Sequence, residues 1–190
     1  ELMKAQNAFL KAQINPHFLF NTLDFIYHNI AESSPIAADA VIILTEMMRY
    51  AVDADKMGDY IRMGDEIEQA EKLIYLNQMR KNHILALKLN YTDEVMEIKL
   101  IPLVVLTLVE NIFKHGSLND PDHEAIINIY NENDIFHIST YNFIDYQSPK
   151  NGSHSGLSNI EKRLRFAYGA NVEFKYETDL DNRFNLHLSI

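Results

Sequence analysis

The sequence predicts an all-helical N-terminal part followed by an α+β domain. Residues 1–31 follow helical periodicity, with no glycine and a single proline, Pro16. From Ile84 onward, stretches appear in which apolar and polar residues alternate with a period of two, which is typical of strands. Helical and strand patterns then interchange up to the C-terminus. This order favours a mixed sheet with helices packed on one face.

Two helices are expected in the N-terminal part, over residues 1–31 and 36–54, with a break at Ser33, Ser34 and Pro35 between them. The second helix is apolar on most of its sides, and it must therefore be buried on most sides. One partner helix cannot provide that burial. We therefore expect a homodimer in which two helical hairpins form a four-helix bundle.

The later elements follow from the same patterns. A helix over residues 65–82 is expected after a linker flanked by Gly58 and Gly64. After it we expect a strand, a helix, two strands joined by a tight turn, a helix and a final hairpin, over residues 84–91, 102–115, 126–130, 135–141, 156–168, 172–176 and 184–188. We place the domains at residues 1–60 and 61–190.

Composition limits the classes of function. The net charge of −10 argues against a nucleic-acid surface, because phosphate backbones require clustered Lys and Arg. No apolar run approaches the ~20 residues of a membrane helix. The chain starts in helical periodicity without an initiating methionine, so we expect it to be a fragment of a longer protein.

The segment QINPHFLFNTLDFI, residues 13–26, reads as a helix with a proline directly before a histidine. Pro16 removes a backbone N–H and crowds the carbonyl of Ala12, so a bend is expected just before His17. This bend should leave His17 partly exposed. A polar stripe follows the same helix face at intervals of three or four residues, formed by Gln13, His17, Asn21, Asp24 and His28.

Three interpretations of His17 are open from the residues alone. It can be a capping or surface histidine, which is the usual role of a single histidine. It can belong to a metal site, but a straight helix spreads the stripe over ~16 Å, so that only a pair such as Asp24 and His28 could share an ion. It can also be a nucleophile, because the free imidazole, with a pKa of ~6.5, is mostly neutral at pH 7.

A second polar cluster lies in LVENIFKHG, residues 108–116, at the end of an expected helix. Glu110 and Lys114 are spaced for an ordinary helix salt bridge. The alternative is a nucleotide site, since the carbonyl of Asn111 suits Mg²⁺ and the side chains of Lys114 and His115 can neutralise phosphate charge.

A third segment, NGSHSGLSNIEKRL, residues 151–164, places Gly156 just before a helix. The free N–H groups at a helix N-terminus suit a phosphate, although an ordinary loop and cap would look the same.

The segment around His17 resembles the phosphoacceptor box of the LytS/YehU-type sensor histidine kinases. It matches the signature QINPHFLFNTLN except that Asp24 replaces the last Asn. The resemblance covers nearly the whole chain, including EKLIYLNQMR at residues 71–80. It implies that His17 is phosphorylated and that the first two helices form a dimerisation and phosphotransfer domain. It also implies a Bergerat-type α/β sandwich, the ATPase-like fold of histidine kinases, for the remainder.

The other two segments are similar to motifs of Bergerat-fold ATPases, LVENIFKHG to the N box and NGSHSGLSNIEKRL to GxGxGLxNxxxRL. The resemblance implies that Asn111 holds Mg²⁺ and that Glu110 is catalytic, as a base or by orienting the nucleophile. Asn142 stands where the family has the adenine-binding Asp of an Asp-x-Gly segment, and residues 143–155 would form a lid over the nucleotide. The implied ATP contacts are Asn111, Lys114, His115, Asn142, Gly152, Gly156, Leu157, Asn159 and Arg163.

The resemblance implies the catalytic core of a two-component kinase, which transfers the ATP γ-phosphoryl group to His17 and then to a response-regulator aspartate. The implied cofactors are ATP and Mg²⁺. The implied partners are a second copy of the chain and a response regulator with a LytTR-type DNA-binding output, with no direct nucleic-acid contact. The chain would be the cytoplasmic portion of a bacterial inner-membrane protein, joined to the membrane through an upstream segment.

The changed Asp-x-Gly segment motivates an alternative, a degenerate kinase that binds a partner or nucleotide without phosphotransfer. An ATP-driven conformational machine of the Hsp90 or gyrase kind would explain the α+β half alone.

Overall fold

The computed structural model describes residues 16–53, 58–145 and 155–190. The chain forms two compact units, residues 1–53 and 54–190. The functional domain division expected between residues 60 and 61 stays a prediction.

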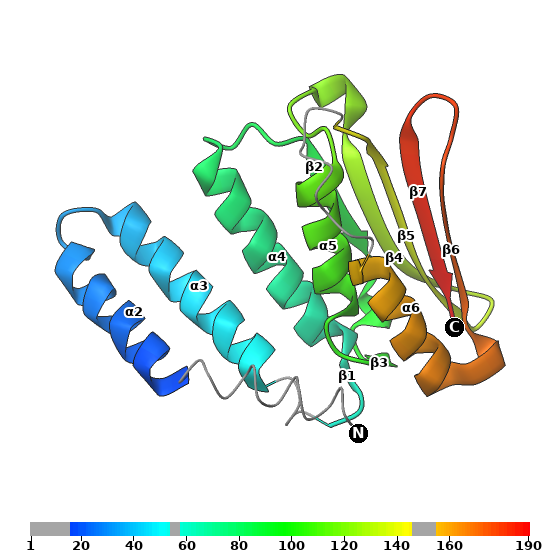
Figure 1. The fold of residues 1–190 in the computed structure, drawn as a ribbon, viewed down its shortest axis with the longest axis horizontal. Coiled ribbons are helices and arrows are strands. Elements are labelled where there is room, and N and C mark those ends of the chain that lie inside the picture. The colour runs from blue at the N-terminus through cyan, green and yellow to red at the C-terminus, as the bar shows by residue number, and fades with distance from the viewer. Residues whose placement is uncertain (1–15, 54–57, 146–154) are drawn as a thin grey trace. The chain divides into compact units, whose positions relative to one another are not determined.

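The described part of the first unit is a pair of helices, α2 (Pro16–Ile30) and α3 (Pro35–Asp53) (Figure 1). Helix α3 begins at Pro35, whose fixed φ angle suits the first turn of a helix. The helix predicted over residues 36–54 is thereby confirmed. Residues before Pro16, including the expected bend, lie outside the described residues.

The helical hairpin leaves large apolar side chains uncovered. Phe18, Phe25 and Ile36 are exposed by 69%, 68% and 71% of their surface. Leu23 and Ala38, by contrast, are buried between the two helices. This distribution agrees with the expected need for more burial than one hairpin provides. The four-helix bundle itself stays a prediction, because a single copy forms only the hairpin.

The second unit is built on a mixed sheet with strand order β2-β4-β5-β7-β6. Strand β2 pairs with β4 in parallel, and the other neighbours are antiparallel. The strands are β2 (Leu87–Tyr91), β4 (Ala125–Glu132), β5 (Ile135–Phe143), β6 (Glu173–Thr178) and β7 (Arg183–Ser189).

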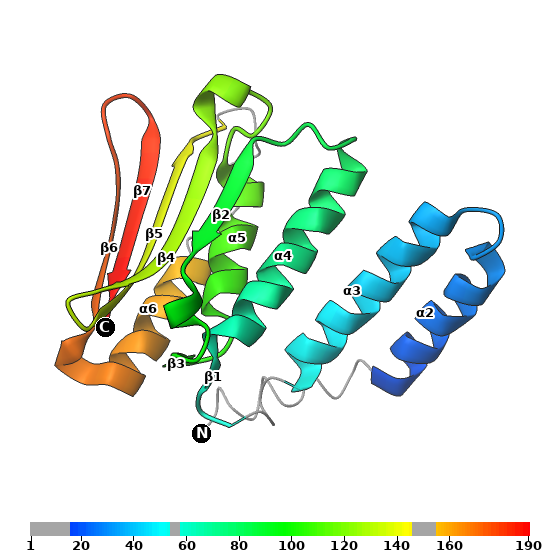
Figure 2. The ribbon, with the colours of Figure 1, turned by 180° about the vertical axis from the view of Figure 1, so that it is seen from behind.

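Three helices cover one face of this sheet (Figures 1 and 2). They are α4 (Met63–Arg80), α5 (Val104–His115) and α6 (Ser155–Tyr168). The expected mixed α/β architecture is confirmed at this level.

The core lies between the sheet and the helices, as the alternation in the sequence predicts. In β4 Ala125, Ile127 and Ile129 are buried, and Ile126 and Asn128 between them are only half-buried. Among the helices that the structure describes, α5 has the most one-sided apolar face, and it contributes Val105, Leu108, Val109 and Ile112 to the core. The tight turn expected between β4 and β5 is made by Asn133 and Asp134, with φ angles of 53° and 63°.

Several short elements were not expected. Strands β1 (Ile61–Arg62) and β3 (Lys99–Leu100) form a separate antiparallel pair. In the part of the chain that the structure describes, three 3₁₀ turns also occur, η2 (Asp93–Val95), η3 (Pro121–His123) and η4 (Gly169–Asn171). Two or three residues carry no readable period, so the sequence pattern could not predict them. Among the described helices, none combines the length and the apolar character that a bilayer crossing needs.

Candidate functional site

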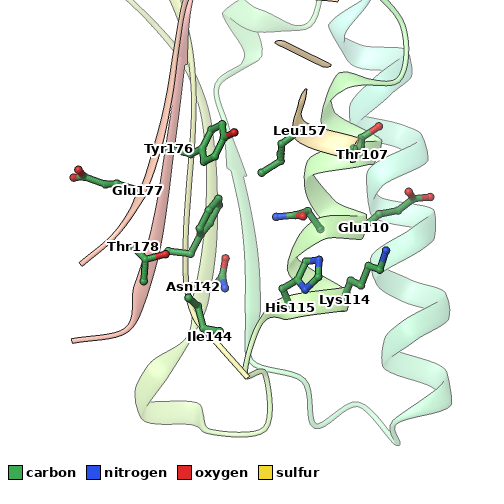
Figure 3. A pocket seen from close by; sticks show the side chains of 13 residues that line it. Thr107, Glu110, Lys114, His115, Asn142, Ile144, Leu157, Tyr176, Glu177 and Thr178 are labelled. Atoms are coloured by element: carbon green, nitrogen blue, oxygen red, sulfur yellow. The ribbon is translucent and has the colours of Figure 1, made fainter. Parts of the chain in front are cut away.

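A cavity of about 510 Å³ lies in the second unit between α5 and the sheet (Figure 3). Helix α5 supplies one wall, the ends of β5, β6 and β7 supply the opposite wall, and the start of α6 closes part of it. The cavity is lined by Thr107, Glu110, Asn111, Lys114, His115, Asn142, Ile144, Gly156, Leu157, Tyr176, Glu177, Thr178 and Phe184.

The structure brings together residues from all three parts of the predicted nucleotide site. The predicted residues that line the cavity are Glu110, Asn111, Lys114, His115, Asn142, Gly156 and Leu157. Gly152 lies outside the described residues. Asn159 and Arg163 do not line the cavity, and the Arg163 Nη2 donates to the carbonyl of Pro102 at 2.6 Å, which ties α6 to the start of α5. The nucleotide contacts expected for these two residues stay predictions.

A buried carboxylate fixes the start of α5. Its N-cap residue, Leu103, has a left-handed φ of 66° and no side chain that can cap a helix. Glu66 of α4 is fully buried, and its Oε1 accepts a hydrogen bond from the Leu103 N–H at 2.6 Å. Its Oε2 accepts from the N–H groups of Val105 and Leu106 at 3.0 and 3.4 Å. Because the first amides of a helix lack intrahelical acceptors, Glu66 acts as the cap.

Sequence reasoning missed Glu66, although a signal was present. Glu66 shares the face of α4 that carries Ala70 and Leu73, at helical spacing. An acidic side chain on an apolar stripe must be hydrogen-bonded once it is buried.

The end of α5 is joined to the end of β5. The carbonyl of His115 accepts from the Asp145 N–H at 2.8 Å, and the Ser117 N–H donates to the Phe143 carbonyl at 2.8 Å. Gly116 lies at the closest approach, where an added Cβ would stand 2.6 Å from the Ile112 carbonyl oxygen. Because Ile112 belongs to α5, a glycine avoids a clash with the last turn of this helix, and it leaves room for the Asn142 Nδ2 of β5, which would lie 3.3 Å from the added Cβ.

Asn142 presents an unpartnered acceptor in this junction. Its side chain is 1% exposed, and its Nδ2 donates to the carbonyl of Phe143 at 3.0 Å. Its Oδ1 is buried and has no hydrogen-bond partner. Buried carbonyl groups are almost always hydrogen-bonded, because an unpaired one is costly. The Oδ1 atom is therefore an acceptor available to a ligand donor such as an amino group.

Glu110 and Lys114 give the helix side of the cavity its charge. Loss of solvation raises the pKa of Glu110 above its usual 4.5, and the nearby Lys114 partly offsets this. A carboxylate with a raised pKa is a stronger base, which agrees with the expected catalytic role. In Figure 3 the side chains of Glu110, Lys114 and His115 all extend from α5.

The donor set fits Mg²⁺ when phosphate oxygens complete it. Asn111 is half-buried and lines the cavity, so its side-chain carbonyl can serve as one oxygen ligand. Within residues 16–53, 58–145 and 155–190, no three His, Cys, Asp or Glu side chains gather so as to hold a metal ion.

His17 lies on the exposed surface of α2 in the first unit. The Asn21 Nδ2 is 3.2 Å from the His17 Nδ1 and 3.4 Å from its Nε2, so the amide lies against the ring. One turn further, the His28 Nε2 lies 3.6 Å from the Asp24 Oδ1, and both of these side chains are exposed. The ring of His17 is thus accessible to a reaction partner.

Comparison with known proteins supports one class of protein. A protein-family model described as histidine kinase matches residues 5–85. Relatives similar to the chain are sensor histidine kinases. The family model and these relatives together support the assignment of the chain to the histidine kinases.

The particular relatives include the sensor histidine kinase BtsS of Escherichia coli (strain K12). The chain is 28% identical to it over 191 aligned positions, which cover 98% of this chain and 34% of BtsS. The chain is also 26% identical to the sensor protein kinase HptS of Staphylococcus aureus (strain USA300) over 107 positions, covering 56% of this chain and 20% of HptS. The chain therefore spans about a third of the length of BtsS.

Solved histidine kinases are more distant. The catalytic domain of histidine kinase ThkA has a TM-score of 0.47 and 15% identity, covering 69% of this chain and 94% of that chain. The Acinetobacter baumannii histidine kinase AdeS has a TM-score of 0.45 and 11% identity, covering 93% of this chain and 94% of that chain.

Proposed function

We propose that the chain is the catalytic core of a LytS/YehU-type two-component sensor histidine kinase, which transfers the γ-phosphoryl group of ATP to His17. One observation carries the proposal. The cavity combines an unpartnered buried acceptor, the Asn142 Oδ1, with the amide of Asn111 and the cation of Lys114. These groups are complementary to a nucleotide, because the amino group of a base can donate to the buried acceptor and a phosphate chain can bind the amide and the cation.

Each side chain has a distinct part in binding. The Asn142 Oδ1 would accept from the adenine amino group and so gain the donor that it lacks. The Asn111 carbonyl would hold Mg²⁺, which supplies neutralisation of phosphate charge. Lys114 and His115 would donate hydrogen bonds to phosphate oxygens.

The transfer itself would use the neutral imidazole of His17. A ring nitrogen lone pair attacks the γ-phosphorus, an N–P bond forms, and the bond from the γ-phosphorus to the β–γ bridging oxygen breaks. ADP leaves with the electron pair, and the proton on the other ring nitrogen passes to a base, for which Glu110 is the candidate. An aspartate carboxylate of the response regulator then takes the phosphoryl group and releases the histidine. Such catalysis is mainly positioning and charge neutralisation.

Labelling with γ-phosphate-labelled ATP tests this proposal. The parent protein should gain acid-labile, base-stable phosphate, and His17→Gln should gain none. His28→Gln is a matched control, since His28 is exposed on the same helix, and it should label like the parent. Labelling of His17→Gln at the parental rate would show that the phosphoacceptor assignment is wrong.

A degenerate kinase remains the second candidate, favoured by the neutral amide of Asn142 in the base-binding position. Calorimetry with ATP and Mg²⁺ separates the two. Tight binding without labelling would favour the degenerate kinase, whereas absence of binding would overturn both the active kinase and the nucleotide-binding form of the degenerate kinase.

We propose two partners for the chain. The first is a second copy, which would cover the exposed Phe18, Phe25 and Ile36 of the hairpin. The second is a response regulator with a LytTR-type DNA-binding output. BtsS extends well beyond the third of its length that this chain matches. We propose that the chain is the cytoplasmic portion of a longer inner-membrane protein.

A further inference from the structure

The sheet side of the cavity carries two aromatic rings that sequence analysis did not single out, Tyr176 of β6 and Phe184 of β7. Their centroids are 6.1 Å apart and their planes are inclined by 34°. Phe184 pairs with Asn142 in the β5–β7 register, so this aromatic surface begins beside the unpartnered acceptor. Tyr176 keeps 39% of its surface exposed.

The opposite wall at this level is aliphatic. Leu157 at the start of α6 is buried, with 4% of its surface exposed, and it lines the same cavity. In Figure 3 the side chains of Tyr176 and Leu157 point toward each other from opposite sides of the cavity, and Asn142 lies on the sheet side with Tyr176. A slot with an aromatic wall, an aliphatic wall and one acceptor suits a flat heteroaromatic ring.

We propose that Tyr176, together with Phe184, forms the surface on which the nucleobase stacks, so that Tyr176 contributes affinity for the base. This inference rests on the proposed function and adds to it the residue that recognises the base as a flat ring. Stacking tolerates any base, because every base has a π face. The Asn142 Oδ1 instead requires a donor, so the two residues divide affinity and selection between them.

A purely structural role for Tyr176 is the competing explanation. Its ring also lies 5.9 Å from that of Phe174, and both belong to β6 of the final hairpin. The test therefore needs a readout that packing within the hairpin would not change. Ring-current shifts on the bound base provide one, because they report an aromatic ring next to the base itself.

The experiment uses the whole chain with ADP and Mg²⁺, followed by proton NMR. The purine H2 and H8 signals should move upfield on binding to the parent. Tyr176→Leu should reduce this shift and weaken binding by about fivefold or more, the lower range for loss of one base–aromatic stack. Tyr176→Phe should retain the shift. Magnesium tripolyphosphate, which lacks a base, should bind the parent and Tyr176→Leu equally.

Tyr130→Leu is the matched control. Tyr130 is half-buried in β4 and stacks with His137, and it does not line the cavity. Its replacement should leave the affinity for ADP and the upfield shift unchanged.

Unchanged affinity and shift in Tyr176→Leu would overturn the inference while leaving the proposed function intact. Failure of the parent to bind ATP or ADP would instead overturn the proposed function. Should Tyr176→Leu not fold, nuclear Overhauser contacts between purine protons and the Tyr176 ring of the parent decide, and their absence would rule the stack out.

Discussion

Asn142 keeps a buried carbonyl oxygen without a donor, which costs about 1–3 kcal/mol in a folded protein. Its orientation is not free, because the Nδ2 donates to the Phe143 carbonyl and the Oδ1 must then face the cavity. An aspartate here would place a carboxylate oxygen against that carbonyl. The neutral amide therefore suits this position, because it can donate to the Phe143 carbonyl. A ligand amino group that donated to the Oδ1 would remove the cost of the unpaired oxygen.

Gly116→Ala should disturb this residue and weaken ATP binding. The new Cβ would stand 2.6 Å from the Ile112 carbonyl oxygen and 3.3 Å from the Asn142 Nδ2, so a neighbour must move. We expect a loss of about 1–3 kcal/mol in the free energy of unfolding, measured by urea denaturation, with lower ATP affinity by calorimetry.

Gly169→Ala is the control for this prediction. Gly169 has a φ of 62° with open space around it, so alanine there adds strain of its own without touching Asn142. It should lower stability but leave ATP affinity unchanged. Equal effects of both variants on ATP affinity would contradict the role assigned to Gly116.

Glu110→Gln should separate stability from activity. Loss of solvation raises the pKa of Glu110 above 4.5, so ionisation of this residue destabilises the folded state. This cost is absent when the pH lies well below 4.5, the ordinary pKa of the group, and complete once the pH exceeds the raised pKa of the folded state. The variant should therefore melt at a higher temperature than the parent at pH 7 and at the same temperature near pH 4.

Labelling of His17 in Glu110→Gln should fall by about 10²–10⁴-fold, the usual contribution of a general base. Glu94→Gln, an exposed change outside the cavity, should alter neither the melting temperature nor labelling. A parental labelling rate in Glu110→Gln would remove this residue from the catalytic step.

At the scale of elements, α5 connects the core with the site. Its apolar face packs into the core, and its other residues supply Glu110, Asn111 and Lys114 to the cavity. Both of its ends are fixed by contacts from distant segments, Glu66 at the start and the β5 junction at the end. The position of the site thus depends on helix placement as well as on its own side chains.

Glu66→Gln should show this dependence. Glutamine has a single acceptor oxygen, and its amide N–H₂ would face the backbone N–H groups of Leu103 or Val105. We expect the free energy of unfolding to fall by about 2–3 kcal/mol and the KM for ATP to rise, as measured by denaturation and by labelling at varied ATP.

Glu68→Gln, on the same helix, is the matched control. Glu68 forms an exposed ion pair with Lys72 at 2.7 Å, and such pairs contribute little. Its free energy of unfolding should stay within about 0.5 kcal/mol of the parent. A loss as large as that of Glu66→Gln would argue against a special role for the buried carboxylate.

At the scale of the molecule, the two units divide the proposed chemistry. The buried core cluster of the α/β unit extends from Met63 to Leu188 and lies wholly within residues 54–190, and His17 lies in the other unit. A fragment of residues 54–190 should therefore fold, bind ATP with the affinity of the full chain and fail to label. Circular dichroism, calorimetry and the labelling assay check these three outcomes, and an unfolded fragment would show that the core needs the hairpin.

The sequence by itself determined most elements of this fold. Periods of 3.6 and 2 are local properties, so the helix over 36–54 and the strand over 135–141 were predicted close to α3 and β5. The residues Glu110, Asn111, Lys114 and His115 were grouped because they share one helix, and all four line the cavity. The family motifs pointed to Asn142 and Gly156 as further members of that lining.

Only the tertiary structure decided which residues from distant parts of the chain join this cavity lining. Tyr176 and Phe184 reach the cavity because β7 and β6 follow β5 in the sheet, and Glu66 reaches α5 because α4 packs beside it. The hydrogen bond from Arg163 to the Pro102 carbonyl also depends on the tertiary structure. These contacts join segments far apart in the chain, and they arise from burial of one shared apolar core, which no local period encodes.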